Sequence, residues 1–369
     1  MILFDFGGRR RRGAVGMEAL LTADPSSVGP YKILGRLGAG GMGQVFLGLS
    51  PTADRVAVKV IKSPLLDDPD LRERFTLEVV NLKTVYGARV ARFEGAGLED
   101  EPPWLAVEYV EGPTLRQHVE RSGPLEATLA AVLGAQLADG LGKVHEAGVL
   151  HRDFKPQNLL LGRDGPKVID FGLAMLLERD HQLTAPGEVV GTLSYMAPEQ
   201  VLGKDLRTST DVYALGATLA YAVTGRPLYP GPGGIVLAHR ISDPAVQPDL
   251  TGVPKDLVTL LGLMLAYEPS ARPGLKVVHD QFVTLAKSSG LTVSTIRRRL
   301  IKATFDPSPQ VVVPPKLADP RADPENIEDR SDAHSGSPQP VRTTQPPTEV
   351  DVRWLADELR AEYARNAGF

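Results

Sequence analysis

The stretch HRDFKPQN at residues 151–158, followed by DFG at residues 170–172, decides how this sequence is interpreted. It supplies two acids and an amide, namely Asp153, Asp170 and Asn158. Oxygen ligands such as the Asp170 carboxylate and the Asn158 amide suit Mg²⁺, which binds through few protein groups and takes other ligands from substrate phosphates. Asp153 is then left to face an attacking hydroxyl. The spacing therefore indicates metal-assisted phosphoryl transfer.

A glycine-rich run precedes this stretch: LGAGGMGQV at residues 37–45, with Gly38, Gly40 and Gly43 forming G-x-G-x-x-G. The following residues, 44–49, alternate like a strand. A dinucleotide-binding fold would open a helix here, and a P-loop would carry Lys at the position of Gln44. Both are disfavoured. The run is either a hairpin whose backbone amides lie against a triphosphate or a flexible β-turn.

Lys59 ends the strand-like segment VAVK at residues 56–59. A buried ammonium group is costly without partners, and a carboxylate together with phosphate oxygens could supply them. Glu78, in the helical segment RFTLEVV, is the expected carboxylate, and Glu73 is its competitor. Taken alone, Lys59 is more often an edge-strand lysine that reaches solvent. The position of Lys59 between the glycine-rich run and the HRDFKPQN stretch favours a contact with phosphate oxygens.

The order of patterned segments predicts an α+β protein with two lobes. Strand-like alternation covers residues 31–37, 44–49, 55–61 and 104–110, and helical spacing of apolar residues covers 129–144, 211–224 and 255–268. We expect the lobe boundary near Glu111 and Gly112.

With these motifs in this order, residues 31–285 resemble the protein kinase superfamily, specifically the bacterial serine/threonine kinases of eukaryotic (Hanks) type. The resemblance implies a protein-kinase-like two-lobed fold, with a small antiparallel β-rich lobe over residues 31–110 and a larger helical lobe over 111–285. It also implies transfer of the γ-phosphate of ATP to Ser or Thr hydroxyls of proteins, with Mg²⁺ as cofactor.

The resemblance assigns a role to each motif residue. Asp153 orients the substrate hydroxyl and accepts its proton, and Lys155 contacts the γ-phosphate. Asn158 and Asp170 hold the metal ions. Lys59 holds the α- and β-phosphates and pairs with Glu78. The other residues expected around ATP are those of the glycine-rich loop (Gly38, Ala39, Gly40, Gly43), those around the adenine ring (Val45, Ala57, Leu160) and the hinge (Glu108 to Val110).

Further positions match structural elements of the family. GTLSYMAPE at residues 191–199 resembles the substrate-docking loop, and the resemblance implies an ion pair between Glu199 and Arg272. Asp211 is expected to anchor the backbone of the catalytic loop, and His151 is expected to be a core histidine.

Arg152, directly before Asp153, needs a negative partner, which in the family is often a phosphorylated residue of the activation loop. The candidates are Thr184, Thr192 and Ser194. Thr192 matches a position that bonds to the catalytic aspartate, so Thr184 is the first choice for regulatory autophosphorylation.

Composition excludes several other classes of protein. Among 369 residues there is no Cys, so disulfides, thiolate metal sites and cysteine nucleophiles are excluded. The 41 basic and 45 acidic side chains nearly balance, which gives no electrostatic reason to expect nucleic-acid binding. No apolar run approaches the roughly 20 residues of a bilayer crossing, and we expect a cytoplasmic protein.

The two ends of the sequence show less regular spacing of apolar residues. Residues 1–30, with an arginine run at 9–12, are expected to be disordered, and Met17 is an alternative start to Met1. Residues 286–350 are expected to be a mostly disordered, Pro-rich linker. Residues 351–369 resume a helical pattern, which indicates either an amphipathic docking helix or a frayed terminus.

Two rival functions compete with catalysis. A pseudokinase would bind partners or nucleotide without catalysis, but Lys59, Glu78, Asp153, Asn158 and Asp170 are all present. An interaction scaffold would use the Pro-rich tail, which has paired prolines but no clear groove ligand.

Overall fold

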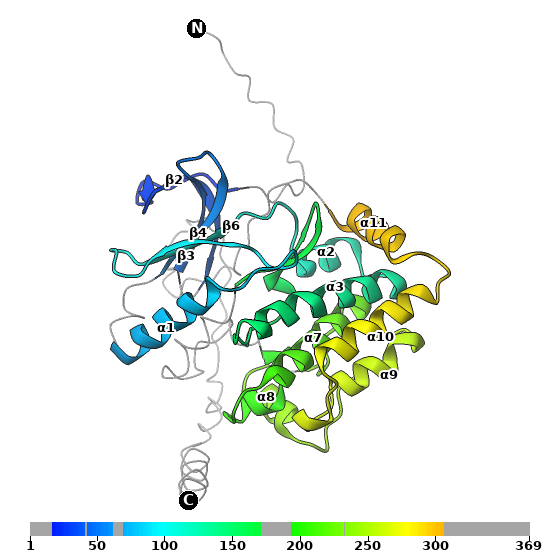
Figure 1. Ribbon diagram of the computed structural model, residues 1–369. Coiled ribbons are helices and arrows are strands. Elements are labelled where there is room, and N and C mark those ends of the chain that lie inside the picture. Colours follow the sequence, from blue (N-terminus) through cyan, green and yellow to red (C-terminus); the bar gives the residue numbers. More distant parts are fainter. Residues whose placement is uncertain (1–16, 41–42, 62–68, 171–192, 232, 306–369) are drawn as a thin grey trace, which may run out of the picture. The chain divides into compact units, whose positions relative to one another are not determined.

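The alternating segments form one antiparallel sheet of six strands in the order β1-β2-β3-β4-β6-β5 (Figure 1). The strands are β1 (Ser27–Val28), β2 (Tyr31–Gly40), β3 (Gly43–Leu49), β4 (Arg55–Ile61), β5 (Phe93–Gly97) and β6 (Trp104–Glu108). The computed structural model describes residues 17–40, 43–61, 69–170, 193–231 and 233–305, all within one unit of the chain. The sheet carries the glycine-rich hairpin at the β2–β3 turn and Lys59 on β4.

Helix α1 (Pro69–Leu82) follows the third long strand and packs on the sheet. Its residues Phe75, Val79 and Leu82 recur at helical spacing and are buried with Ile61 and Leu105. Burying one such side chain contributes about 1.5–3 kcal/mol. This stripe holds α1 beside the strand that carries Lys59.

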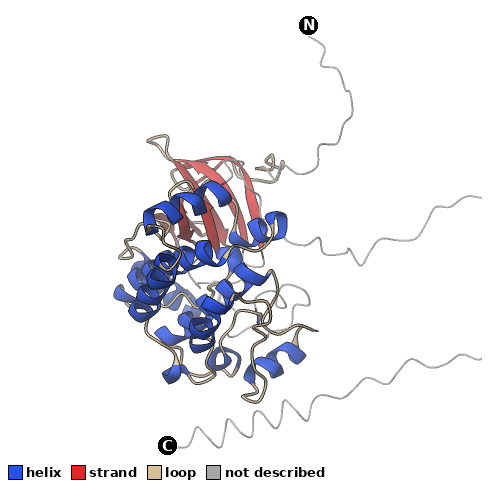
Figure 2. Cartoon of the chain, turned by 90° about the vertical axis from the view of Figure 1, so that its right-hand side faces the viewer, coloured by secondary structure: helices blue, strands red, loops and turns tan. Residues whose placement is uncertain are grey.

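The second part of the unit is helical, and Figure 2 shows the strands gathered at one end and most helices at the other. Its elements are α2 (Leu115–Ser122), α3 (Ala127–Glu146), η2 (Pro156–Asn158), β7 (Leu159–Gly162), β8 (Gly165–Val168), α6 (Pro198–Val201), α7 (Thr208–Thr224), α8 (Ile235–Ser242), α9 (Lys255–Met264), η3 (Pro269–Ala271), α10 (Leu275–Lys287) and α11 (Val293–Thr304). The expected α+β class, with a small antiparallel sheet followed by a larger helical part, is confirmed.

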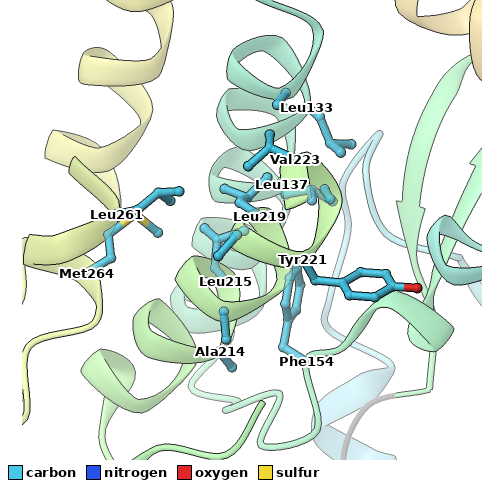
Figure 3. Close-up of a cluster of buried hydrophobic side chains, with 14 of the residues drawn as sticks. Leu133, Leu137, Phe154, Ala214, Leu215, Leu219, Tyr221, Val223, Leu261 and Met264 are labelled. Carbon is cyan, nitrogen blue, oxygen red and sulfur yellow. The ribbon is translucent and has the colours of Figure 1, made fainter. Parts of the chain in front are cut away.

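The core of the helical part forms around α3 and α7 (Figure 3). Leu133 and Leu137 of α3 belong to this cluster together with Leu215 and Leu219 of α7, and all four are at most 2% exposed. Phe154, within the HRDFKPQN stretch, is buried in the same cluster. The HRDFKPQN stretch is therefore attached to the core by an apolar side chain that lies between polar ones.

The expectation of disorder for residues 1–30 is wrong for the part that the structure describes. Residues 17–28 lie along the free edge of β2, where Glu18 forms an antiparallel bridge with Arg36 and β1 pairs with Tyr31 and Lys32. Backbone hydrogen bonds to a sheet edge need no apolar pattern, so composition gave no signal of them. Residues 1–16 lie outside the described residues.

The expectation of a mostly disordered linker from residue 286 is wrong for its first part. Helix α11 buries Ile296, Leu300 and Thr304, spaced four apart, and it contacts α3, β7 and β8. The run Arg297–Arg299 between these residues concealed the spacing. Residues 306–369, with the Pro-rich stretch and the expected terminal helix, lie outside the described part. None of the described helices is both long enough and apolar enough to cross a membrane.

Candidate active site

The catalytic stretch is fixed by one buried carboxylate on α7. Asp211 accepts hydrogen bonds from the backbone N–H of His151 at 2.8 Å and of Arg152 at 2.9 Å, and it contacts His145 Nε2 at 2.7 Å. Arg152 has φ 62°, a left-handed conformation that is unfavourable for a side chain of this size. The two bonds to Asp211 hold the backbone in that conformation, as expected for an anchoring aspartate.

The charge state of Asp211 follows from these bonds. Burial alone would raise the pKa of the Asp211 carboxyl, but the hydrogen bond and charge of His145 and the bonds from His151 outweigh it, so its pKa is lowered. His151 is fully buried, and burial lowers the pKa of its imidazole. It packs edge-on against Phe154, with ring centroids 5.2 Å apart. The core role expected for this histidine is confirmed.

The Asp153 carboxylate uses one oxygen for structural contacts. Its Oδ2 accepts a hydrogen bond from Asn158 Nδ2 at 3.0 Å and lies 2.8 Å from Lys155 Nζ. Asn158 Nδ2 also donates to the Asp153 carbonyl at 2.8 Å. Oδ1 accepts no hydrogen bond from the described residues. This oxygen is the one available to a hydroxyl group.

Asn158 and Asp170 are brought together by the β7–β8 hairpin. The N–H of Ile169, the residue before Asp170, donates to the Asn158 carbonyl at 2.9 Å. Both side-chain bonds of Asn158 use its nitrogen, which leaves the amide oxygen without a donor among the described residues. An amide oxygen and a carboxylate are a donor set that fits Mg²⁺. The residues present therefore fit the Mg²⁺ that the sequence resemblance implies.

Lys59 approaches Asp170 from the sheet. Its Nζ lies 3.3 Å from Asp170 Oδ1, with the two side chains 20% and 45% exposed. Partial burial would raise the pKa of the Asp170 carboxyl, but the ammonium groups of Lys59 and Lys155 outweigh it and lower its pKa. A cation from the sheet and an anion from the helical part thus meet at one place. Glu78 belongs to α1, but its side chain lies outside the described part, so its pairing with Lys59 stays a prediction.

The glycine-rich run forms the β2–β3 hairpin expected from its pattern. Gly38 pairs with Val45, Ala39 with Gln44 and Gly40 with Gly43. The Gln44 side-chain amide donates to the Gly38 carbonyl across the hairpin. A Cβ added at Gly43 would overlap the carbonyl oxygen of Val60 on β4, so only glycine fits there without a shift of backbone. Residues 41 and 42 lie outside the described part.

The residues expected around adenine come from both parts of the unit. Val45 pairs with Lys59, Ala57 pairs with Val107, and Leu160 lies on β7; all three expected contacts are partly buried. At the expected hinge, Val110 is buried, and Glu108 accepts two hydrogen bonds of 2.6 Å from Lys167 of β8. The Glu108 side chain is therefore engaged with the helical part, and its backbone remains the expected adenine contact.

The segment around Glu199 is braced by the expected ion pair. Arg272 donates to both carboxylate oxygens of Glu199, at 2.6 and 2.9 Å, and its guanidinium carbon lies 4.9 Å from the centre of the Tyr213 ring. Thr210 adds a hydrogen bond to Glu199 at 2.8 Å. Ser194 is described, whereas Thr184, Thr192 and the FG of the DFG motif lie outside the described residues.

Sequence reasoning missed one contact of the catalytic stretch. Gln200 Nε2 donates to the Arg152 carbonyl at 2.7 Å, which ties the residue after Glu199 to the residue before Asp153. Its position next to the APE signature was the available signal, but no motif rule names it.

The family model of the protein kinase domain matches residues 31–283 of this chain. The chain belongs to the protein kinase family. It is similar to the probable serine/threonine-protein kinase PkwA of Thermomonospora curvata, with 43% identity over 258 residues, 70% of this chain and 34% of that protein. It is also similar to the serine/threonine-protein kinase AfsK of Streptomyces coelicolor, with 40% identity over 70% of this chain and 32% of that protein. The chain spans about a third of the length of these relatives.

Solved kinase domains share the fold. The crystal structure of the Mycobacterium tuberculosis PknI kinase domain matches with a TM-score of 0.57 and 25% identity, covering 71% of this chain and 100% of that chain. Together with the named relatives, this confirms the resemblance to bacterial Hanks-type serine/threonine kinases.

Proposed function

We propose that this protein is a serine/threonine protein kinase that transfers the γ-phosphate of ATP to hydroxyls of protein substrates. One observation carries the proposal: Asp153 contacts Lys155 and Asn158 at 2.8–3.0 Å, Lys59 contacts Asp170 at 3.3 Å, and the N–H of Ile169, the residue before Asp170, joins the two groups by its 2.9 Å bond to the Asn158 carbonyl. Positioning and charge neutralisation supply most of the rate in phosphoryl transfer. The family membership and the named relatives support the same activity.

Each residue has a task in this proposal. Asp153 orients the acceptor hydroxyl through Oδ1 and takes its proton, while its Oδ2 keeps Lys155 close to the transferred phosphoryl group. Lys59 neutralises charge on the α- and β-phosphates. Asn158 and Asp170 would hold Mg²⁺, which when bound neutralises charge on the phosphate oxygens.

Regulation and setting belong to the proposal as well. We propose a cytoplasmic enzyme that phosphorylates itself, with Thr184 as the first candidate, because the Arg152 guanidinium next to Asp153 suits a phosphate partner. Phosphopeptide mapping of an active preparation tests this. An unmodified activation loop would exclude Thr184 as the regulatory site.

The test of the function is transfer from γ-labelled ATP, in the presence of Mg²⁺, to a generic basic protein. We expect label on phosphoserine or phosphothreonine after hydrolysis, and loss of transfer in Lys59→Met. The matched control is Lys32→Met, an exposed lysine on β2, which should transfer at the wild-type rate. Transfer by Lys59→Met at the wild-type rate, or no transfer by the wild type, would overturn the proposal.

A further inference from the structure

Residues 17–28, which we call the N-terminal flank, extend the sheet beyond the region matched by the kinase family model. Glu18 and Arg36 exchange two backbone hydrogen bonds of 3.0 Å, and the N–H of Ile33 donates to the Ser26 carbonyl at 3.0 Å. The flank thus lies beside β2, the strand that leads into the glycine-rich loop. Nothing in the reaction chemistry of the site uses it.

A bidentate ion pair between Asp24 and Arg36 joins the N-terminal flank to β2. Arg36 donates from Nε to Asp24 Oδ2 at 2.7 Å and from Nη2 to Asp24 Oδ1 at 2.6 Å. The N–H of Leu21 also donates to Asp24 Oδ2, at 2.7 Å, so the carboxylate holds its own loop in place. The side chains of Asp24 and Arg36 are only 6% and 22% exposed. Bidentate geometry and burial make this pair stronger than an ordinary surface pair.

Arg36 lies between two irregularities in the pairing of β2 with β3. The β2–β3 register shifts between Ile33 and Gly35 and again between Arg36 and Gly38. Such irregularities bend a strand and increase its twist, so they set the direction of the residues beyond them. Gly38, the first glycine of the loop, comes two residues after Arg36. The contacts that hold Arg36 therefore influence the direction of the glycine-rich loop.

A second contact fixes the same point without charge. The Met17 side chain covers Gly35, where an added Cβ would lie 2.5 Å from Met17 Cγ and 2.9 Å from the Glu18 carbonyl oxygen. Gly35 is buried under the flank. A side chain at this position would push the flank away from β2.

We propose that the N-terminal flank is a brace that positions the glycine-rich loop over ATP, with Asp24 and Arg36 as positioning residues. The proposal rests on the proposed function in one respect, namely that this loop covers a nucleotide. Release of the brace allows the loop more orientations, only some of which contact the phosphates. ATP binding weakens as a result, while Asp153, Lys155 and the metal-binding residues keep their contacts.

The test measures ATP dissociation constants by direct titration with Mg²⁺ present, together with KM for ATP, KM for the protein substrate and kcat, in the full chain. We expect Asp24→Asn and Gly35→Ala each to weaken ATP binding by roughly fivefold or more, with KM for the protein substrate and kcat within twofold of wild type. The double variant should bind ATP about as tightly as the single variant with the lower ATP affinity, because both changes release the same segment. Asp280→Asn, which breaks the exposed Lys276–Asp280 pair on α10, is the matched control and should change nothing.

Unchanged ATP binding in both single variants would overturn the brace. An equal change in KM for both substrates together with a lower kcat would also overturn it, because that pattern indicates general loss of the fold. A wild type that binds ATP but transfers no phosphate would instead overturn the proposed function, and the titrations would still test the brace.

Discussion

The Asp153 carboxylate makes its side-chain contacts with Lys155 and Asn158 through Oδ2, so that Oδ1 is available to a hydroxyl group. Oδ2 is shared by Lys155 and Asn158, so the carboxylate cannot rotate without breaking a charge-assisted contact. The backbone around it is held by Asp211 and by Gln200. The direction of Oδ1 is therefore set by the contacts of Oδ2 with Lys155 and Asn158 and by the backbone bonds to Asp211 and Gln200.

A side chain at Gly43 is expected to weaken ATP binding. A methyl group there overlaps the Val60 carbonyl, so Gly43→Ala must separate the start of β3 from β4 and displace the glycine-rich loop. We expect KM for ATP to rise on the order of tenfold, which corresponds to about 1.4 kcal/mol of binding free energy. Steady-state kinetics at varied ATP concentration measures this.

The matched control for that change is Gly142→Ala on α3, where an added Cβ meets nothing within 4 Å. KM for ATP should stay at the wild-type value, and the melting temperature should rise slightly, because alanine is favoured over glycine by about 1 kcal/mol within a helix. An equal KM for Gly43→Ala and wild type would show that the loop tolerates a side chain at this position.

Spacing along the chain predicted the residues of the catalytic stretch, because the motif HRDFKPQN fixes them on one short loop. Spacing did not predict that Lys59 would contact Asp170, since that distance depends on how a strand and a hairpin far apart in sequence are brought together. The Asp24–Arg36 pair was missed for a similar reason. An aspartate in a polar stretch gives no sign that an arginine twelve residues later will bind it.

At the scale of elements, α6 is joined to the segment after η3 by the buried Glu199–Arg272 pair. Burial alone would raise the pKa of the Glu199 carboxyl, but hydrogen bonds and charge from Arg272 outweigh it and hold the pKa below its ordinary value of 4.5. A carboxyl with a lowered pKa in the folded state contributes stability above pH 4.5. That contribution is lost as the pH falls through the folded-state pKa.

We expect Glu199→Gln to lower the free energy of unfolding by about 3 kcal/mol at pH 7, because it leaves the buried Arg272 guanidinium without its counter-charge. The difference from wild type should shrink as the pH falls below 4.5 and be lost once the pH is below the lowered folded-state pKa of the Glu199 carboxyl. Urea unfolding at several pH values measures it. Glu120→Gln, which breaks the exposed Arg116–Glu120 pair on α2, should cost less than about 1 kcal/mol at every pH. A difference for Glu199→Gln that persists unchanged to low pH would contradict this role.

The element order could be predicted because strand alternation and helical spacing are local signals, and β2, β3, β4, α3, α7 and α9 all lie where those signals are strong. Helix α11 was missed because three consecutive arginines interrupt its apolar spacing, although Ile296 and Leu300 lie four apart. Arg297 donates to the Asp164 carbonyl at 2.8 Å, so one of these arginines binds the β7–β8 turn. A charged run can therefore belong to a packed helix when one of its members has a backbone partner.

For the molecule as a whole, the sheet and the helical part share an apolar cluster that joins α1 and β6 to the end of α3. Phe75 and Leu105 from the first part are buried with Val144 and Val149 from the second. This cluster fixes the strand of Lys59 relative to the hairpin of Asp170. The Lys59–Asp170 contact consequently depends on packing between parts that are separate in sequence.

The central claim is that these contacts form a phosphotransfer site in which Asp153 directs the acceptor hydroxyl. The most direct test is Asp153→Asn, measured both for ATP affinity and for the rate of phosphate transfer at saturating ATP and Mg²⁺. We expect ATP affinity within about twofold of wild type and a transfer rate lowered by roughly 10²–10⁴, the usual contribution of a positioned base. A folded Asp153→Asn variant that binds ATP and transfers phosphate at the wild-type rate would show that Asp153 does not have this role.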